Sequence, residues 1–150
     1  MNIKKTLTIA TVAIIAFASF AFTTVLKTKK VKTEASTVSW KAYKITGSSH
    51  EGTVNLKEGE LIFDGKTLTG GSFVVDMTSI KNTDMSGEMA GKLEGHLKSD
   101  DFFGVKDHPT AKFVIKNVKG KDNTYKVNGD LTIKGKTNPI SFVMTLKNNM

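Results

Sequence analysis

The chain has 150 residues and no cysteine, which excludes disulfides, thiolate chemistry and Cys-based zinc sites. With 39% hydrophobic and 24% charged residues, it is too apolar for a disordered protein and fits one globular domain with additional segments. The net charge is +8, and every basic residue is a lysine. Because readers of nucleic-acid bases favour the planar guanidinium of arginine, this composition does not indicate a nucleic-acid interface.

The first 21 residues are typical of a secretory signal. Two lysines precede an uncharged run over residues 6–26, and small residues predict cleavage after Ala18 or Ala21. The alternative is an uncleaved anchor, since 21 uncharged residues can just span a bilayer. Either interpretation predicts an exported protein, periplasmic or extracellular. The second also predicts attachment to the membrane through the N-terminus.

Lysine-rich residues 22–35 are interpreted as a polar linker, and residues 36–150 as one domain. Before residue 124, short stretches show the alternation of apolar and polar side chains that predicts half-buried strands. Their apolar positions are Val38, Trp40, Ala42, Val54, Leu56, Leu61, Phe63, Phe73, Val75, Met77, Phe113 and Ile115. Asp64-Gly65 and Gly70-Gly71 are turn signals, and Asn117 indicates a bulge.

The clearest alternation lies in residues 124–146. Its apolar positions are Tyr125, Val127, Leu131, Ile133, Ile140, Phe142, Met144 and Leu146. The turn-rich stretch GKTNP, from Gly135 to Pro139, interrupts this pattern and predicts a long antiparallel hairpin with one apolar face. Together the segments predict an all-β protein, either a sandwich or an up-and-down barrel.

One helix is expected within this β chain, over residues 84–97. Apolar side chains recur every fourth residue, at Met85, Met89, Leu93 and Leu97. Asp84 is the expected N-cap. Glycines at 87, 91 and 95 weaken the helix by about 1 kcal/mol each relative to alanine and predict a smooth side for close packing. The helix is interpreted as a plug at the end of the sheet, or alternatively as a movable lid.

No motif in the sequence requires catalytic activity or a bound metal ion. Two Gly-Lys-Thr triplets, beginning at Gly65 and Gly135, lack the glycine that a phosphate-binding loop requires and are interpreted as turns. His96, Asp101 and His108 are the residues from which a metal-dependent or hydrolytic site could be built, but their spacing does not require one. We therefore expect no catalytic residues, no metal and no enzyme activity.

The stretch HLKSDDFFGVKDHPTAKF, residues 96–113, resembles the signature of the YceI-like family, also called polyisoprenoid-binding proteins. VSWKAYKITGSSHEGTVNL, GGSFVVDMTSIKNTD and YKVNGDLTIKGKTNPISF are similar to other stretches of that family. The resemblance implies a lipocalin-like antiparallel β-barrel around an elongated apolar cavity. It also implies an exported, non-catalytic carrier of a polyisoprenoid or a prenylated quinone-like lipid, with no other cofactor.

The resemblance and the alternation together give candidate site residues. The expected apolar lining is Trp40, Phe63, Phe73, Phe113, Tyr125, Val127, Leu131, Phe142 and Met144. The expected lid or mouth is Met85, Met89, Leu93, His96, Asp101, Phe102 and Phe103. In this interpretation Phe102 and Phe103 wedge the loop into the end of the barrel, and Asp101 accepts hydrogen bonds from backbone amides.

The family usually continues beyond the strand at residues 140–146. The barrel is therefore expected to be incomplete at its C-terminal end, with residues 140–146 as an apolar edge strand able to pair with a second copy in a homodimer. An alternative function is a degenerate barrel without ligand, acting as an anchored or secreted interaction domain.

Overall fold

The computed structural model describes residues 25–147. Its elements are β1 (Leu26–Lys30), the 3₁₀ helix η1 (Thr33–Ala35), β2 (Val38–Tyr43), β3 (Ser49–Asp64), β4 (Thr67–Asn82), α1 (Gly87–Lys98), β5 (Thr110–Lys121), β6 (Thr124–Ile133) and β7 (Lys136–Thr145). Every strand pairing is antiparallel. The expected all-β antiparallel fold with one short inserted helix is confirmed.

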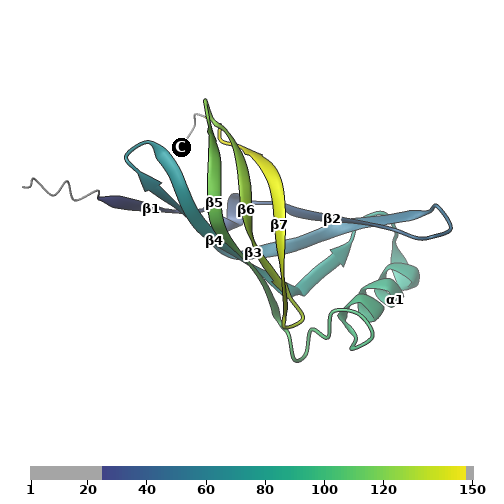
Figure 1. The fold of residues 1–150 in the computed structure, drawn as a ribbon. Helices are drawn as coiled ribbons and strands as arrows, with labels where there is room; N and C mark the ends of the chain where they lie inside the picture. The colour runs from purple at the N-terminus through teal and green to yellow at the C-terminus, as the bar shows by residue number, and fades with distance from the viewer. Residues whose placement is uncertain (1–24, 148–150) are drawn as a thin grey trace, which may run out of the picture.

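The strands form one strongly curved sheet with the order β1-β3-β4-β5-β6-β7, and β2 pairs with the other half of β3 (Figure 1). In residues 25–147, β7 pairs only with β6, so the sheet does not close into a barrel. Ile140, Phe142 and Val143 on this edge strand are 36%, 40% and 69% exposed. Pairing of this edge with a second copy remains a prediction.

The inner face of the sheet carries the first of two apolar clusters. Residues paired directly across antiparallel strands point to the same face, so alternation along each strand builds one apolar layer. The first cluster consists of Leu61, Phe63, Leu68, Phe113, Ile115, Tyr125 and Val127. Val127 is fully buried. A register shift between Ile115 and Asn117 confirms the predicted bulge.

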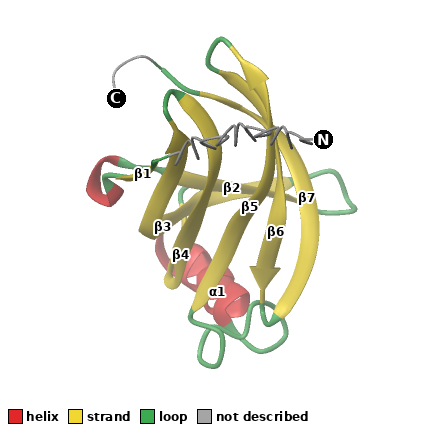
Figure 2. Ribbon diagram, turned by 60° about the vertical axis from the view of Figure 1, so that its left-hand side comes forward, coloured by secondary structure: helices red, strands yellow, loops and turns green. Residues whose placement is uncertain are grey.

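The second cluster lies where α1 packs against β4, at one end of the curved sheet (Figure 2). Leu97 is buried there and Leu93 packs at its border. Met89 is 63% exposed and Met85 lies before the helix begins, so only the C-terminal half of the predicted apolar stripe packs. The N-cap prediction was wrong: Ser86 occupies that position, and the Asp84 side chain binds other groups.

The expectation that the helix glycines allow close packing was also wrong. A Cβ added to Gly91 or Gly95 would meet no atom within 4 Å. Both glycines face open space, where they lower helix propensity without any packing gain.

Replacing Gly91 or Gly95 by alanine is therefore expected to raise the free energy of unfolding, by about 1 kcal/mol at most for each site. The measurement is chemical denaturation of each single variant. Gly87→Ala is the matched control, because Gly87 also faces open space but has a φ of 64°, which disfavours a Cβ. Stabilisation by G87A, or destabilisation by G91A and G95A, would contradict this interpretation.

The segment expected to be a polar linker contains ordered elements. Leu26–Lys30 forms β1, which pairs with β3 from Glu60 to Asp64, and Thr33–Ala35 forms η1. The charged sequence of β1 did not predict a strand, because it lacks the alternation of apolar and polar residues. The strand is revealed by its pairing with the long β3. The predicted signal or anchor lies in residues 1–21, outside the described residues. Among residues 25–147, no helix has the length and apolar character needed to cross a membrane.

Candidate functional site

Most of the predicted lining residues share the concave inner face of the sheet. The register places on this face Phe63, Phe73, Phe113, Tyr125, Val127, Leu131, Phe142 and Met144. The rings of Phe113 and Phe142 lie 5.3 Å apart at the β7 edge. Trp40 instead packs beside the second cluster. The prediction did not include Leu68 and Ile115, although both are buried in the first cluster.

Several side chains of this face are buried in the first cluster, and open recesses lie beside β1. One recess of about 320 Å³ is lined by Lys27, Lys29, Phe63, Gly65, Lys66, Asn123, Tyr125, Leu146 and Lys147. A larger recess of about 720 Å³ is lined by Lys29, Lys30, Val31, Lys32, Ala35, Ser36 and Leu61. Because both include Lys29, the recesses flank the same lysine.

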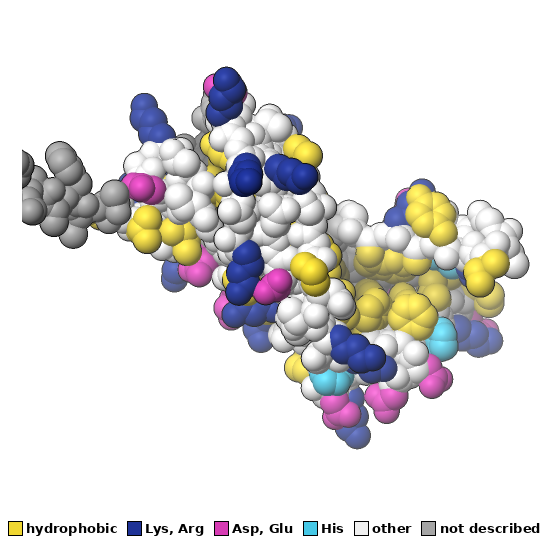
Figure 3. Space-filling view, viewed as in Figure 1, with side chains coloured by type: hydrophobic (Ala, Val, Ile, Leu, Met, Phe, Trp, Pro, Cys, Tyr) yellow, Lys and Arg dark blue, Asp and Glu magenta, His cyan; other side chains and the backbone are white. Residues whose placement is uncertain are grey.

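The predicted lid residues lie at the opposite end, where α1 covers the sheet. Phe103 packs against the second cluster, but Phe102 is 46% exposed. Phe102 makes edge contacts with the rings of His96 and Phe103, at centroid distances of 5.6 and 5.2 Å. Only one of the two phenylalanines therefore anchors the loop in the core. Figure 3 shows further hydrophobic side chains on the surface between β2 and α1.

The loop after α1 is held by groups other than Asp101. The Asp101 side chain is exposed and has no hydrogen bond within residues 25–147, so the predicted contact with backbone amides was wrong. The Ser99 hydroxyl donates to the His96 carbonyl at 2.7 Å, and the Gly104 amide donates to the Ser99 carbonyl at 2.8 Å. Lys134 Nζ donates to the Asp100 carbonyl at 2.5 Å, which links the loop to the β6–β7 turn.

The metal or hydrolytic alternative gains no support from this geometry. In the part of the chain that the structure describes, no group of three or more His, Asp or Glu side chains is placed to hold a metal ion. His96, Asp101 and His108 therefore do not form a common metal-binding centre.

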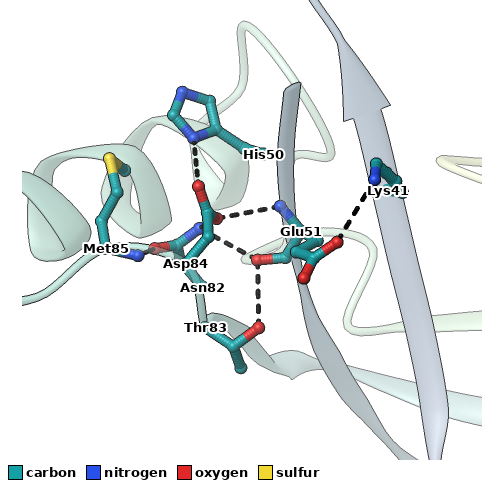
Figure 4. A network of polar contacts seen from close by, with 7 residues as sticks. All are labelled: Lys41, His50, Glu51, Asn82, Thr83, Asp84 and Met85. Atoms are coloured by element: carbon teal, nitrogen blue, oxygen red, sulfur yellow. Dashed lines mark hydrogen bonds and ion pairs between the residues drawn. The ribbon is translucent and has the colours of Figure 1, made fainter. Parts of the chain in front are cut away.

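A polar network connects β3, the end of β4 and the residues before α1 (Figure 4). Asp84 Oδ2 accepts a hydrogen bond from His50 Nδ1 at 2.9 Å, and Asp84 Oδ1 accepts one from the Glu51 amide at 2.9 Å. Asn82, which is 4% exposed, donates to Asp84 and to the Glu51 carbonyl and accepts from the Met85 amide. Hydrogen bonds from Glu51 and His50 lower the pKa of Asp84 to about 2.

This network fixes the connection between the sheet and the helix. None of the hydrogen bonds within residues 25–147 joins His50 to a hydroxyl group, so the described geometry shows no nucleophile held by the His50–Asp84 pair. The buried amide of Asn82 is engaged by the β3 backbone, by Asp84 and by the Met85 amide in the segment before α1. The sequence pattern predicted only an N-cap role for Asp84, since its partners His50 and Glu51 are more than 30 residues away in the chain.

The lowered pKa of Asp84 predicts how stability depends on pH. Its carboxylate is favoured in the folded state, so its contribution is present above the unfolded pKa, near 4, and is lost as the pH falls through about 2. Asp84→Asn should lower the midpoint of urea denaturation at pH 7. The difference from the parent protein should shrink between pH 4 and pH 2. A difference that is constant over this range would contradict the role of the Asp84 charge.

Comparison with known proteins identifies the family. The model of the YceI-like domain matches residues 30–150. The chain belongs to the YceI-like family. A UPF0312 protein of Pseudomonas putida is 34% identical over 109 residues, which cover 72% of this chain and 55% of that protein. A UPF0312 protein of Shewanella denitrificans is 32% identical over 91 residues, or 60% of this chain and 46% of the relative.

The chain spans about half the length of the curated relatives that it matches. Among solved structures, BcnA of Burkholderia cenocepacia is similar with a TM-score of 0.58 and 25% identity, covering 76% of this chain and 69% of BcnA. The expected family and fold class are therefore confirmed. The YceI-like family supports a binder-type fold, and it is not known for enzyme activity.

Proposed function

We propose that this YceI-like protein is an exported carrier of a long apolar lipid, of the polyisoprenoid or prenylated quinone class, held against the inner face of the sheet. The observation that carries the proposal is the continuous apolar layer from Phe63 to Phe142, on a curved sheet whose β7 edge pairs with no further strand within residues 25–147. Partial exposure of Phe142 leaves apolar surface for a ligand to cover.

The energetics suit a ligand with a flexible hydrocarbon tail. Each buried CH₂ group contributes roughly 0.8 kcal/mol, so a few isoprenoid units reach micromolar affinity despite the cost of ordering the tail. Such a tail needs no hydrogen bonds along its length. The inner face suits such a tail, because it offers aromatic and aliphatic side chains as apolar contacts. Export is part of the proposal and rests on the signal-like sequence before residue 22.

Phe142→Ser tests whether the inner face binds the lipid. The variant should weaken uptake of a short-chain prenylated quinone by about tenfold or more, since it removes an exposed apolar contact beside Phe113. Affinity would be measured by titration calorimetry with the full chain. Val143→Ser is the matched control, because Val143 is the next residue and points to the opposite face.

Phe142→Leu separates lost binding from lost folding, because leucine keeps the surface apolar. This variant should retain most of the affinity. Equal weakening by F142S and V143S, with thermal midpoints unchanged, would place the lipid elsewhere. Absence of uptake by the parent protein would favour the degenerate barrel acting as an interaction domain.

A further inference from the structure

The hairpin that joins β2 to β3 presents two strongly exposed apolar side chains at its tip. Ile45 is fully exposed and Tyr43 is 74% exposed. Within residues 25–147, β2 pairs with β3 alone, and Figure 1 shows this hairpin projecting beyond the ends of β5, β6 and β7. A single exposed isoleucine is ordinary on a protein surface, but neighbouring aliphatic and aromatic side chains on a projecting tip indicate a contact surface.

Backbone hydrogen bonds close this tip into an ordered turn. The Lys44 amide donates to the Ser48 carbonyl at 2.7 Å, and the Gly47 amide donates to the Lys44 carbonyl at 2.9 Å. Gly47 has a φ of 92°, in the left-handed region that favours glycine. Because the turn already holds Tyr43 and Ile45 at the tip, little backbone must be ordered when they bind, which lowers the cost of binding.

The tip carries positive charge. Lys41 and Lys44 lie on either side of Tyr43 in the chain, and residues 41–49 contain no Asp or Glu. Lys41 Nζ lies 5.7 Å from the centre of the Tyr43 ring and 3.5 Å from the Glu51 carboxylate, in an exposed ion pair. Among the described residues, Lys44 forms no ion pair. The tip thus joins apolar side chains to flexible ammonium groups that can extend toward a negatively charged surface.

The small size of the tip favours a lipid surface over a protein partner. An aromatic side chain buries roughly 150–250 Å² when it is covered, whereas each partner in a specific protein interface buries about 800 Å². A bilayer requires no such area, since tyrosine and lysine lie at its head-group level and apolar side chains enter just below. Anionic lipids attract each nearby lysine, and the whole chain has a net charge of +8.

We propose that the tip of the β2–β3 hairpin docks this protein onto an anionic lipid surface. Ile45 and Tyr43 enter the boundary between the head groups and the acyl chains, and Lys41 and Lys44 contact lipid phosphates. A single hairpin tip of this size gives weak and reversible attachment. The inference goes beyond the carrier function, because it stands whatever the inner face binds.

The absence of cysteine allows one fluorophore to be placed at a chosen site. Ile45→Cys and Val143→Cys, each labelled with an environment-sensitive dye, would be mixed as full chains with vesicles of phosphatidylcholine and phosphatidylglycerol in equal parts. Emission from position 45 should shift to the blue and rise about twofold or more. Position 143, exposed on the outer face of β7, should not respond. Any binding through the apolar run of residues 6–26 is common to both variants.

Lys44→Gln in the labelled Ile45→Cys protein tests the contribution of charge. It should reduce the shift at position 45 by about half or more at low salt, since each lysine near an anionic surface adds an attraction that salt screens. Lys119→Gln is the matched control, because Lys119 is exposed on β5 and its substitution removes the same charge away from the tip.

No shift at position 45, or equal shifts at positions 45 and 143, would overturn the docking surface. A shift of the same size with vesicles of phosphatidylcholine alone would overturn the role of anionic lipid. A shift that grows with protein concentration in the absence of vesicles would assign the tip to a second copy and overturn the lipid assignment. These readouts are independent of lipid uptake by the inner face, so failure of the docking inference leaves the carrier function standing.

Discussion

Val127→Asp is expected to abolish folding. Val127 is fully buried at the centre of the first cluster, paired with Phe142 on one side and Val118 on the other. An unpaired carboxylate at this position costs several kcal/mol, which is comparable to the whole stability of a small domain, about 5–15 kcal/mol. Circular dichroism should show loss of the β spectrum, or a transition that begins without denaturant.

Val143→Asp is the matched control for this prediction. The same change of residue type falls on β7, where Val143 is 69% exposed and points to the outer face. The free energy of unfolding should change by no more than about 0.5 kcal/mol. If V127D folded as well as V143D, the inner face would not be the core of the protein.

Gly52→Ala is expected to cause the second largest loss. A Cβ at Gly52 would lie 1.9 Å from the Lys81 carbonyl oxygen and 2.6 Å from the Trp40 ring. Gly52 pairs with Trp40 on one side and Asn82 on the other, so the clash forces apart the strands that carry the Asp84 network. The expected cost is about 3 kcal/mol, at the upper end for overpacked sites, measured as a lower midpoint of urea denaturation.

Gly70→Ala is the control in the same pair of strands. Gly70 is buried, but an added Cβ would meet only Ile62 side-chain atoms, at 3.7 Å and beyond, which is ordinary contact. Its substitution should change stability by less than about 1 kcal/mol. If G52A and G70A lowered the free energy of unfolding by similar amounts, the prediction would be wrong. The pairing of β2, β3 and β4 would then not depend on the missing side chain at Gly52.

Sequence alone predicted the parts of the fold that rest on local periodicity. Alternation in residues 124–146 predicted the β6–β7 hairpin and its apolar face, because each strand buries every second side chain. Apolar side chains at every fourth residue from Met85 to Leu97 predicted the helix. The family signature at residues 96–113 was interpreted as the loop that follows the helix. It did not predict which phenylalanine is buried, since Phe102 and Phe103 are adjacent and only the tertiary packing selects Phe103.

The missed features depend on contacts between distant residues. Strand β1 was mistaken for linker because its inner positions, Lys27 and Lys29, are charged, and only pairing with β3 reveals them. The role of Asp84 required the approach of His50 across the sheet. The mouth was expected beside His96 and Asp101, in the most distinctive motif. That expectation stays a prediction, and an open recess also lies at the opposite end of the sheet, beside β1.

The most direct measurement is mass spectrometry of an organic extract from the full chain, purified after expression with its own N-terminal segment. We expect about one long-chain isoprenoid lipid per protein molecule, and depletion of that lipid in Phe142→Ser but not in Val143→Ser. An empty parent protein that also fails to take up added prenylated quinone would contradict the proposed carrier function.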